Sequence, residues 1–202
     1  MTRKTVPTLA LVLACAAAFA LSGLLEAQDL HPSRRTSPMG MARITLDDGT
    51  YVRVVYSRPY KRGRDNIFGS EESGALVPFG NLWRTGANEA TEITVTGDVM
   101  IGEERLPAGT YSLFTTPGPE TWTFHFNSAL GLSGAFARNP ETGEFENAYK
   151  AENDAVTASV SAGTTEEEVD QLTFSFEEVE GGAHMVLRWI ETEVRVPIKP
   201  AS

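Results

Sequence analysis

The stretch TWTFHFN at residues 121–127 decides the fold class of this chain. Trp122, Phe124 and Phe126 alternate with polar residues such as His125, so the large apolar side chains fall on one face of an extended strand. A helix would spread the three aromatic residues around its circumference, because its side chains repeat every 3.6 residues. We therefore expect a half-buried β-strand here, with its aromatic face turned into the core of a sheet protein.

The same alternation recurs along most of the chain. Asp48-Gly49 and Gly181-Gly182 are suited to tight hairpins between neighbouring strands. A short helical turn is expected only at Thr165–Asp170, where Thr165 and Glu168 have capping-box spacing. The sequence predicts an all-β, single-domain antiparallel β-sandwich or jelly roll of roughly ten strands. The expected strands are Arg43–Leu46, Thr50–Ser57, Glu92–Thr96, Val99–Ile101, Arg105-Leu106, Thr110–Thr115, Thr121–Asn127, Val156–Ser161, Leu172–Glu177, Met185–Trp189 and Glu193–Ile198.

Two segments do not follow the strand pattern. Arg58–Asn81 is long and rich in Gly, Pro and charge, and Gly134–Asn153 is the second irregular stretch. We expect both to be surface excursions, because long connections without structure of their own are usually functional or disordered.

The first 27 residues have the order of a cleavable signal peptide. Arg3 and Lys4 precede an uncharged apolar stretch, Leu9–Leu25, and we favour cleavage between Ala27 and Gln28. The alternatives are cleavage after Ser22, an uncleaved anchor, and lipid attachment through Cys15, which we do not favour. We expect a flexible tether at 28–40, a β-sandwich domain at 41–200, and an exported protein of the periplasm or the extracellular space.

Composition excludes several classes of function. The chain from Gln28 onward carries 15 Lys+Arg and 26 Asp+Glu, a net charge of −11, which argues against non-specific binding to nucleic acid or an anionic membrane. We expect no membrane span in the mature chain. Cys15 is the only cysteine, so the domain has no thiol for disulfides, metals or catalysis. The three histidines lack metal-ligand spacing, and we expect neither a metal nor another cofactor.

Charge is distributed unevenly along the chain, and this directs attention to one region. Residues 34–84 hold nine basic and five acidic residues, whereas 85–202 hold six and twenty. Planar guanidinium groups suit carboxylates and phosphates, and aromatic faces suit sugar rings. The alternative is internal: Arg84 pairs with Glu89, and Trp83 fills the core. The predicted ligand-binding residues are Tyr56, Arg58, Lys61, Arg64, Trp83, Arg84, Asn88 and Glu89.

Several motifs in this region and beyond it carry a family resemblance. They are Tyr56-Ser57-Arg58-Pro59, Lys61-x-Gly63-Arg64, Ile67-Phe68-Gly69, Leu76-Val77-Pro78-Phe79-Gly80, the run from Trp83 to Thr91, and the run from Leu106 to Phe114. Together they resemble the bacterial exported family catalogued as domain of unknown function 2911, over roughly residues 37–199. That family has no established activity, so the resemblance implies relatives and export but no reaction. The chain departs from the family pattern in the acidic insert Ser70–Ser73 and at Leu132–Phe136, where a Trp-Gly segment is expected.

Three hypotheses for function remain. We favour a binding module for an anionic or carbohydrate-like small molecule or glycan. The second is a cell-envelope hydrolase using Glu89 and Arg84, although the sequence contains no catalytic motif. Hydrolysis of this kind needs a second acid, and Glu92 does not qualify because it is expected to point away from Glu89. The third is a structural protein that binds a partner by adding a strand to an exposed sheet edge.

Overall fold

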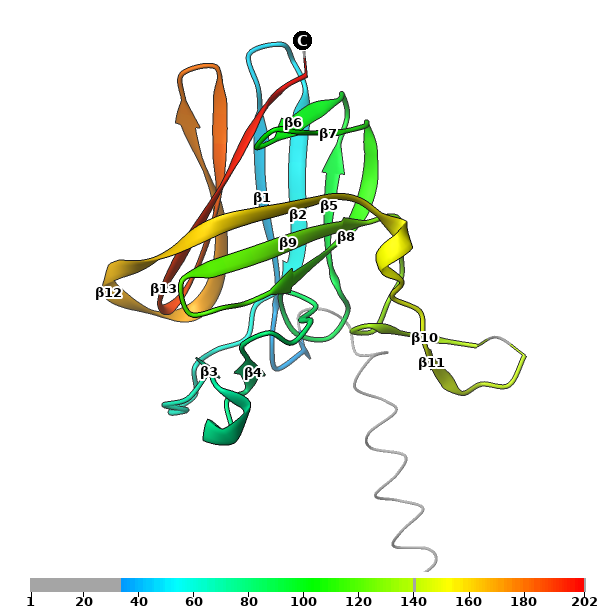
Figure 1. Cartoon of the computed structure of the whole chain (residues 1–202), viewed down its shortest axis with the longest axis vertical. Helices are drawn as coiled ribbons and strands as arrows, with labels where there is room; N and C mark the ends of the chain where they lie inside the picture. The colour runs from blue at the N-terminus through cyan, green and yellow to red at the C-terminus, as the bar shows by residue number, and fades with distance from the viewer. Residues whose placement is uncertain (1–33, 140, 202) are drawn as a thin grey trace, which may run out of the picture. The chain divides into compact units, whose positions relative to one another are not determined.

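A computed structural model describes residues 34–139 and 141–201, and this part of the chain is almost entirely β (Figure 1). Nine strands form one sheet in the order β1-β2-β5-β8-β9-β12-β13-β6-β7. The predicted signal peptide lies outside the described residues, as do residues 28–33 of the tether. The described part contains no helix with the length and apolarity needed to cross a membrane. The strands of this sheet are β1 (Met39–Thr45), β2 (Tyr51–Ser57), β5 (Thr91–Val95), β6 (Val99–Ile101), β7 (Glu104–Leu106), β8 (Gly109–Thr116), β9 (Thr121–Asn127), β12 (Asp154–Val179) and β13 (Gly182–Pro200).

The all-β prediction is confirmed, and the aromatic strand lies at the centre of the fold. Trp122, Phe124 and Phe126 of β9 are buried, each at most 1% exposed, and face inward together. Val52, Val54 and Tyr56 of β2 are also buried in the same core cluster. These strands thus supply the apolar face that the alternation predicts.

Two long strands turn the single sheet into a sandwich. The first part of β12 pairs with β9, from Asp154 to Ser161, and its later part pairs with β13. The β12–β13 ladder shifts register on both sides of Val169, and Ile190 takes a positive φ of 56°. Such irregularities bend and twist a strand pair. Four of the predicted strands are therefore two continuous, bent strands.

The helical turn predicted at Thr165–Asp170 does not form. This segment is part of β12, where the Thr165 hydroxyl donates to the carbonyl oxygens of Glu167, at 2.7 Å, and Ile190, at 3.3 Å. The prediction was wrong because Thr165 uses its hydroxyl to hold the bend of β12 against β13. Pairing with β13, which is distant in the sequence, thus outweighs the local capping-box preference for a helical turn.

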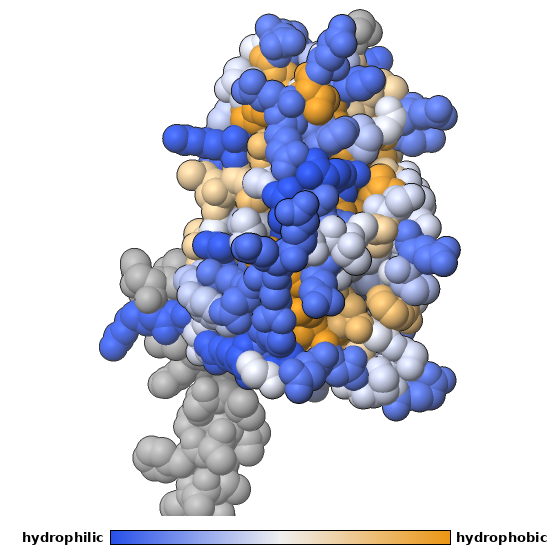
Figure 2. Space-filling view, turned by 90° about the vertical axis from the view of Figure 1, so that its left-hand side faces the viewer, coloured by the Kyte–Doolittle hydropathy of each residue, from blue (hydrophilic) through white to orange (hydrophobic). Residues whose placement is uncertain are grey.

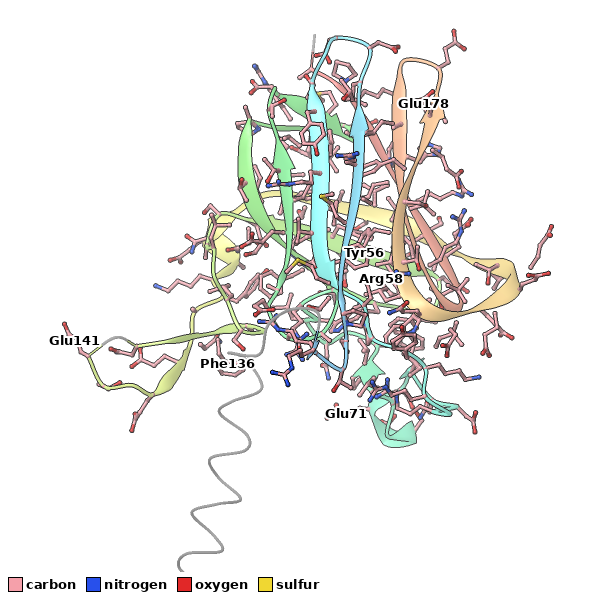
Figure 3. All side chains as sticks on the ribbon, turned by 180° about the vertical axis from the view of Figure 1, so that it is seen from behind. Tyr56, Arg58, Glu71, Phe136, Glu141 and Glu178 are labelled. Atoms are coloured by element: carbon pink, nitrogen blue, oxygen red, sulfur yellow. The ribbon has the colours of Figure 1, made fainter. Side chains whose placement is uncertain are left out.

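The end of β2 closes the sandwich against the free edge of β12. The Phe174 amide donates to the Tyr56 hydroxyl at 2.8 Å, and the Leu172 amide donates to the Pro59 carbonyl at 3.0 Å. The Arg58 Nε–H donates to the Leu172 carbonyl at 3.1 Å, and the Lys61 amide donates to the Asp170 carbonyl at 2.7 Å. Figure 3 shows Tyr56 and Arg58 directed toward this strand. We call this set of contacts, from residues 56–61 to residues 170–174, the seam.

The seam depends on a glycine in β1. A Cβ atom at Gly40 would lie 2.5 Å from Arg58 Cδ and 2.9 Å from Tyr56 Cζ. The side chains of Tyr56, in β2, and of Arg58, just after it, therefore lie over β1 at its only glycine. The β1 strand begins at Met39, so Gly40, assigned to the tether on sequence grounds, lies within the sheet.

The two edges of the sheet are poorly suited to adding a partner strand. The outer edge of β1 lies alongside β12, and the seam joins the end of β2 to β12 next to it. The other edge strand, β7, is three residues long and exposes Glu104 and Arg105. Short, charged edges discourage strand addition. This geometry weighs against the third hypothesis for function.

The two irregular segments are more ordered than their sequences suggest. The first contains the parallel pair β3 (Phe68–Gly69) and β4 (Val77–Pro78), a 3-10 turn at Glu71–Ser73, and the buried Ile67. The second contains the hairpin of β10 (Phe136–Arg138) and β11 (Phe145–Asn147), followed by a 3-10 turn at Ala151–Asn153. A small apolar cluster that includes Ala90, Phe114, Leu132 and Tyr149 packs part of the second segment against the outside of the sheet.

Four charged residues form a closed network on the outer face of β12 and β13. Arg188 contacts Glu177 at 2.7 Å and Glu193 at 2.6 Å, and Arg195 pairs with the same two carboxylates. These hydrogen bonds, first from Arg195 and then from Arg188, lower the pKa of Glu177 from 4.5 to about 2. The adjoining surface is mainly hydrophilic, with only small, separate hydrophobic areas (Figure 2). The network links Glu177 of β12 with three residues of β13 that lie on both sides of Ile190.

We predict that Glu177 makes stability sensitive to acid. Because its pKa is lowered in the folded state, its contribution is complete above pH 4.5 and is lost as the pH falls through about 2. Glu177→Gln should lower the free energy of unfolding at neutral pH, and the difference from wild type should vanish near pH 2. Urea unfolding at a series of pH values measures this. Glu178→Gln, the exposed neighbour, is the matched control, and an equal effect of both variants would contradict the network.

Candidate functional site

Three of the basic residues predicted to bind an anion, Arg58, Lys61 and Arg64, make contacts within the chain. Arg58 belongs to the seam, and the Lys61 ammonium pairs with Glu168 at 2.6 Å. The Arg64 guanidinium donates to the carbonyl oxygens of Tyr60, at 2.6 Å, and Lys61, at 3.0 Å. These cations are engaged in internal contacts, so the positive charge of this region does not form a converging receptor.

Trp83 lies in an aromatic cluster at one end of the core. Its ring stacks on Trp189 with centroids 6.0 Å apart and an interplanar angle of 16°, and it meets Trp122 and Phe68 edge-on. Its indole N–H donates to the Gly86 carbonyl at 3.1 Å. Of the two interpretations of Trp83, core packing is the one that the structure supports.

The loop from Trp83 to Thr91 is held in a strained conformation. Thr85 and Asn88 have φ values of 54° and 57°, in the left-handed region that non-glycine residues rarely adopt. The Thr91 hydroxyl donates to the Thr85 carbonyl at 2.8 Å. The Asn88 amide donates to the hydroxyl of Ser57 at 3.0 Å and to the Ser37 carbonyl at 3.2 Å. Backbone strain of this kind costs about 1–3 kcal/mol per residue and clusters at functional sites.

Arg84 is the most unusual charged residue in this loop. Its Nε–H is buried and has no hydrogen-bond acceptor within the described part of the chain. Burial lowers the pKa of the guanidinium, and the carboxylate of Glu89 opposes this shift. A Cβ atom at Gly134 would lie 3.1 Å from Arg84 Nη1, so a glycine with a positive φ of 68° gives the guanidinium its space.

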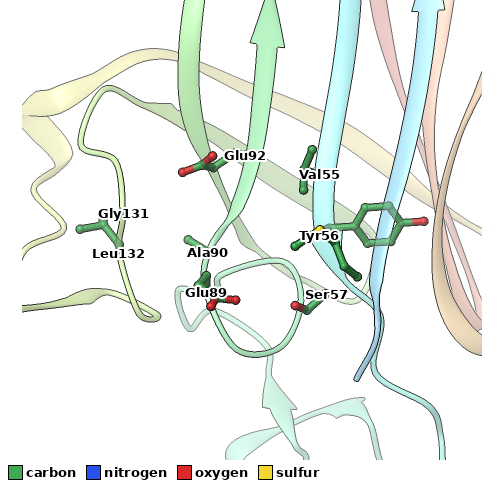
Figure 4. A pocket seen from close by; sticks show the side chains of 9 residues that line it. Val55, Tyr56, Ser57, Glu89, Ala90, Glu92, Gly131 and Leu132 are labelled. Carbon is green, nitrogen blue, oxygen red and sulfur yellow. The ribbon is translucent and has the colours of Figure 1, made fainter. Parts of the chain in front are cut away.

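A pocket of about 180 Å³ opens on the outer side of β2 and β5, next to this loop (Figure 4). Two of the predicted site residues line it, Tyr56 and Glu89, although the Tyr56 ring points away from the pocket and into the seam. We call it the glutamate pocket. Its lining residues are Met39, Val55, Tyr56, Ser57, Glu89, Ala90, Glu92, Gly131 and Leu132.

The expectation that Glu92 points away from Glu89 was wrong. Both glutamates line the glutamate pocket. Glu92 lies on the outer face of β5, opposite Val55 of β2, whereas Glu89 lies in the loop that precedes the strand. The expectation assumed strand alternation at both positions, but β5 begins only at Thr91 and the left-handed turn at Asn88 redirects the preceding chain.

Sequence reasoning missed the far wall of the pocket. Gly131 and Leu132 form this wall; Leu132 begins the segment that departs from the family pattern and is 3% exposed. The Ala90 amide donates to the Leu132 carbonyl at 2.9 Å, which fixes this wall to the strained loop. The only local sequence feature that could have indicated this wall is an apolar residue, Leu132, directly after a glycine.

A polar network pins the segment that supplies this wall. His125 Nδ1 lies 3.0 Å from Asp154 Oδ2, and its Nε2 lies 3.0 Å from the Thr116 hydroxyl. The Tyr149 hydroxyl donates to Asp154 at 2.8 Å, and burial together with this bond raises the pKa of Tyr149. His125 faces outward from the sheet, as its strand position predicts, but its side chain is only 16% exposed. Within residues 34–139 and 141–201, no three His, Cys, Asp or Glu residues are grouped so as to hold a metal ion.

We predict that Arg84 contributes little to stability. A buried, incompletely hydrogen-bonded charge can be replaced by an apolar side chain of similar size at little cost when no opposite charge is left buried, and Glu89, which faces Arg84 electrostatically, is exposed. Arg84→Met should leave the free energy of unfolding within about 1 kcal/mol of wild type, or raise it. Urea unfolding measures this. Trp83→Ala is the contrast, with an expected loss of about 3–5 kcal/mol because it empties part of the aromatic cluster. A loss above about 2 kcal/mol in Arg84→Met would mean that the arginine supports the fold.

Comparison with known proteins agrees with the resemblance in the sequence. The family described as "Protein of unknown function (DUF2911)" matches residues 37–198, which include the whole glutamate pocket and the strained loop. No curated protein and no solved structure matches the chain significantly. Since the match covers most of the chain, this protein belongs to the DUF2911 family of proteins of unknown function.

Proposed function

We propose that this chain is an exported ligand-binding module whose ligand occupies the glutamate pocket. The observation that supports this most directly is the pairing of two carboxylates, Glu89 and Glu92, with apolar walls in one concave site. Pockets of this kind, mostly apolar with a few polar groups, are typical of small-molecule sites. Export rests on the predicted leader at residues 1–27.

The lining of the pocket favours a ligand rich in hydrogen-bond donors. Ionised carboxylates only accept hydrogen bonds, so Glu89 and Glu92 suit hydroxyl or ammonium groups. Met39, Val55 and Leu132 offer apolar contact to carbon atoms. A carbohydrate-like ring, neutral or bearing an amine, combines both properties. A volume of about 180 Å³ suits a ligand of one ring or one ring of a longer glycan.

The anionic ligand considered from the sequence fits this pocket less well. Two glutamates line it, and the nearby guanidinium of Arg84 offsets only part of their charge. A carboxylate or phosphate would meet net repulsion there. The basic residues Lys61 and Arg64, which motivated the anionic proposal, make their contacts elsewhere.

The strained loop supports a functional role for the same site. Thr85 and Asn88 adopt left-handed conformations in the loop that brings Glu89 to the pocket that Glu92 also lines. A fold selected for stability alone would gain by relieving this strain and the unsatisfied Arg84. Both features belong to the loop that carries Glu89 into the lining of the pocket, which is consistent with stability given up for binding.

The hydrolase alternative gains one observation from the structure. Glycoside hydrolysis uses two carboxyl groups about 5–10 Å apart on either side of a glycosidic bond. Glu92 supplies the second carboxylate that the sequence did not identify. Turnover of chromogenic glycosides that is lost in both Glu89→Gln and Glu92→Gln would favour this alternative over simple binding.

We predict that Glu92 strengthens the binding of cationic ligands. In a thermal-shift series with neutral monosaccharides, amino sugars and uronic acids, the first two classes should raise the melting temperature of the wild type. Uronic acids should not, because the carboxylates repel them. Glu92→Gln should reduce the shift by amino sugars, since it removes one negative charge from the pocket.

Glu103→Gln is the matched control, because Glu103 is exposed in the turn between β6 and β7. It should bind as the wild type does. Stabilisation by uronic acids alone, insensitive to Glu92→Gln, would contradict the proposal and return attention to the basic residues.

A further inference from the structure

A second pocket, of about 130 Å³, lies at the aromatic end of the core. It is formed where the β3–β4 segment meets the turn before β9 and the bend of β12 and β13. We call it the aromatic pocket. Its lining residues are Phe68, Phe79, Gly118, Pro119, Trp122, Ala162, Gly163, Thr164 and Thr192.

The aromatic walls are held in fixed orientations. Phe68 meets Trp122 edge-on with centroids 4.9 Å apart, and it also contacts Trp83 and Trp189 edge-on. The Phe79 amide donates to the Gly69 carbonyl at 2.7 Å, which holds its loop in place. Phe68 and Phe79 are only half-buried, so their rings remain partly accessible from the pocket.

The rim of the pocket is polar but uncharged. Thr164 and Thr192 face each other across the β12–β13 ladder and provide hydroxyl groups. Gly118 is required by the turn, since a Cβ atom there would lie 2.5 Å from the Thr121 carbonyl oxygen. None of the nine lining residues is ionisable, in contrast to the glutamate pocket.

We infer that the aromatic pocket binds a single neutral pyranose ring. A sugar ring presents an apolar C–H face, which suits the rings of Phe68 and Phe79, and hydroxyl edges, which suit Thr164 and Thr192. At about 130 Å³ the pocket is slightly smaller than a cavity of roughly 150 Å³ that binds benzene, so it takes one face of the pyranose ring and leaves the rest of the sugar outside. The absence of charge among the lining residues favours a neutral sugar over an ion or an amine.

This site is independent of the proposed ligand of the glutamate pocket. The two pockets share no lining residue. Tryptophan fluorescence also distinguishes the two pockets. All three tryptophans of the chain belong to the aromatic cluster, and Trp122 lines the aromatic pocket, whereas no tryptophan lines the glutamate pocket.

Titration of intrinsic tryptophan fluorescence with neutral methyl glycosides tests the inference. The full chain should show a saturable change with at least one methyl pyranoside. Phe79→Ala should weaken the affinity about tenfold, because it removes a stacking surface. Thr192→Val keeps the shape and strand propensity of the residue, and should weaken the affinity about twofold to tenfold through loss of one hydrogen bond.

Two controls separate this site from other surfaces. Phe136→Ala removes an exposed aromatic residue outside the pocket, and Glu92→Gln alters only the glutamate pocket, so both should leave the fluorescence titration unchanged. Several results would overturn the inference. They are no response to any neutral glycoside, equal responses in wild type and Thr192→Val, and saturation by a small aromatic compound such as p-cresol but by no sugar. Loss of the response in Glu92→Gln alone would assign it to the other pocket.

Discussion

The seam between residues 56–61 and the edge of β12 is the constraint on which the rest of this fold depends. The sheet begins at β1 and bends back through β12, so its first and middle strands come side by side without forming a ladder. Unpaired backbone groups in the interior are costly, and here the Tyr56 hydroxyl, the Arg58 guanidinium and the Pro59 carbonyl serve the groups of Leu172 and Phe174. Two side chains and one isolated antiparallel bridge, between Tyr60 and Gln171, thereby stand in place of a continuous strand ladder, and the sandwich closes.

Closure at the seam determines where a site can form. It commits Tyr56 and Arg58 to structural contacts and leaves the opposite side of β2 open to the glutamate pocket. The strained loop is joined to the same strand through Asn88, which donates to the Ser57 hydroxyl. A single short segment, the end of β2, thus closes the core on one side and supports Glu89 and Glu92 on the other.

Alternation and turn chemistry predicted much of the fold. The aromatic face of β9, the hairpin at Asp48-Gly49 and the turn around Gly181 follow from local rules that the structure respects. The continuity of β12 through Thr165–Asp170 could not be predicted, since it depends on pairing with β13 across the bend. For the candidate site, the sequence identified the loop that carries Arg84 and Glu89. It could not show that Arg58 and Lys61 contact β12, or that Asn88 turns the chain so that Glu89 joins Glu92, because these outcomes depend on long-range contacts.

Amide hydrogen exchange at Leu172 and Phe174 tests the seam most directly. Their N–H groups donate to Pro59 and to the Tyr56 hydroxyl rather than to a neighbouring strand. If the seam closes the sandwich, both amides exchange as slowly as those at the centre of β8 and β9, and Tyr56→Phe accelerates exchange at Phe174. Fast exchange of Phe174 in the wild-type protein, with β8 and β9 still protected, would show that the edge of β12 is open and would contradict this account.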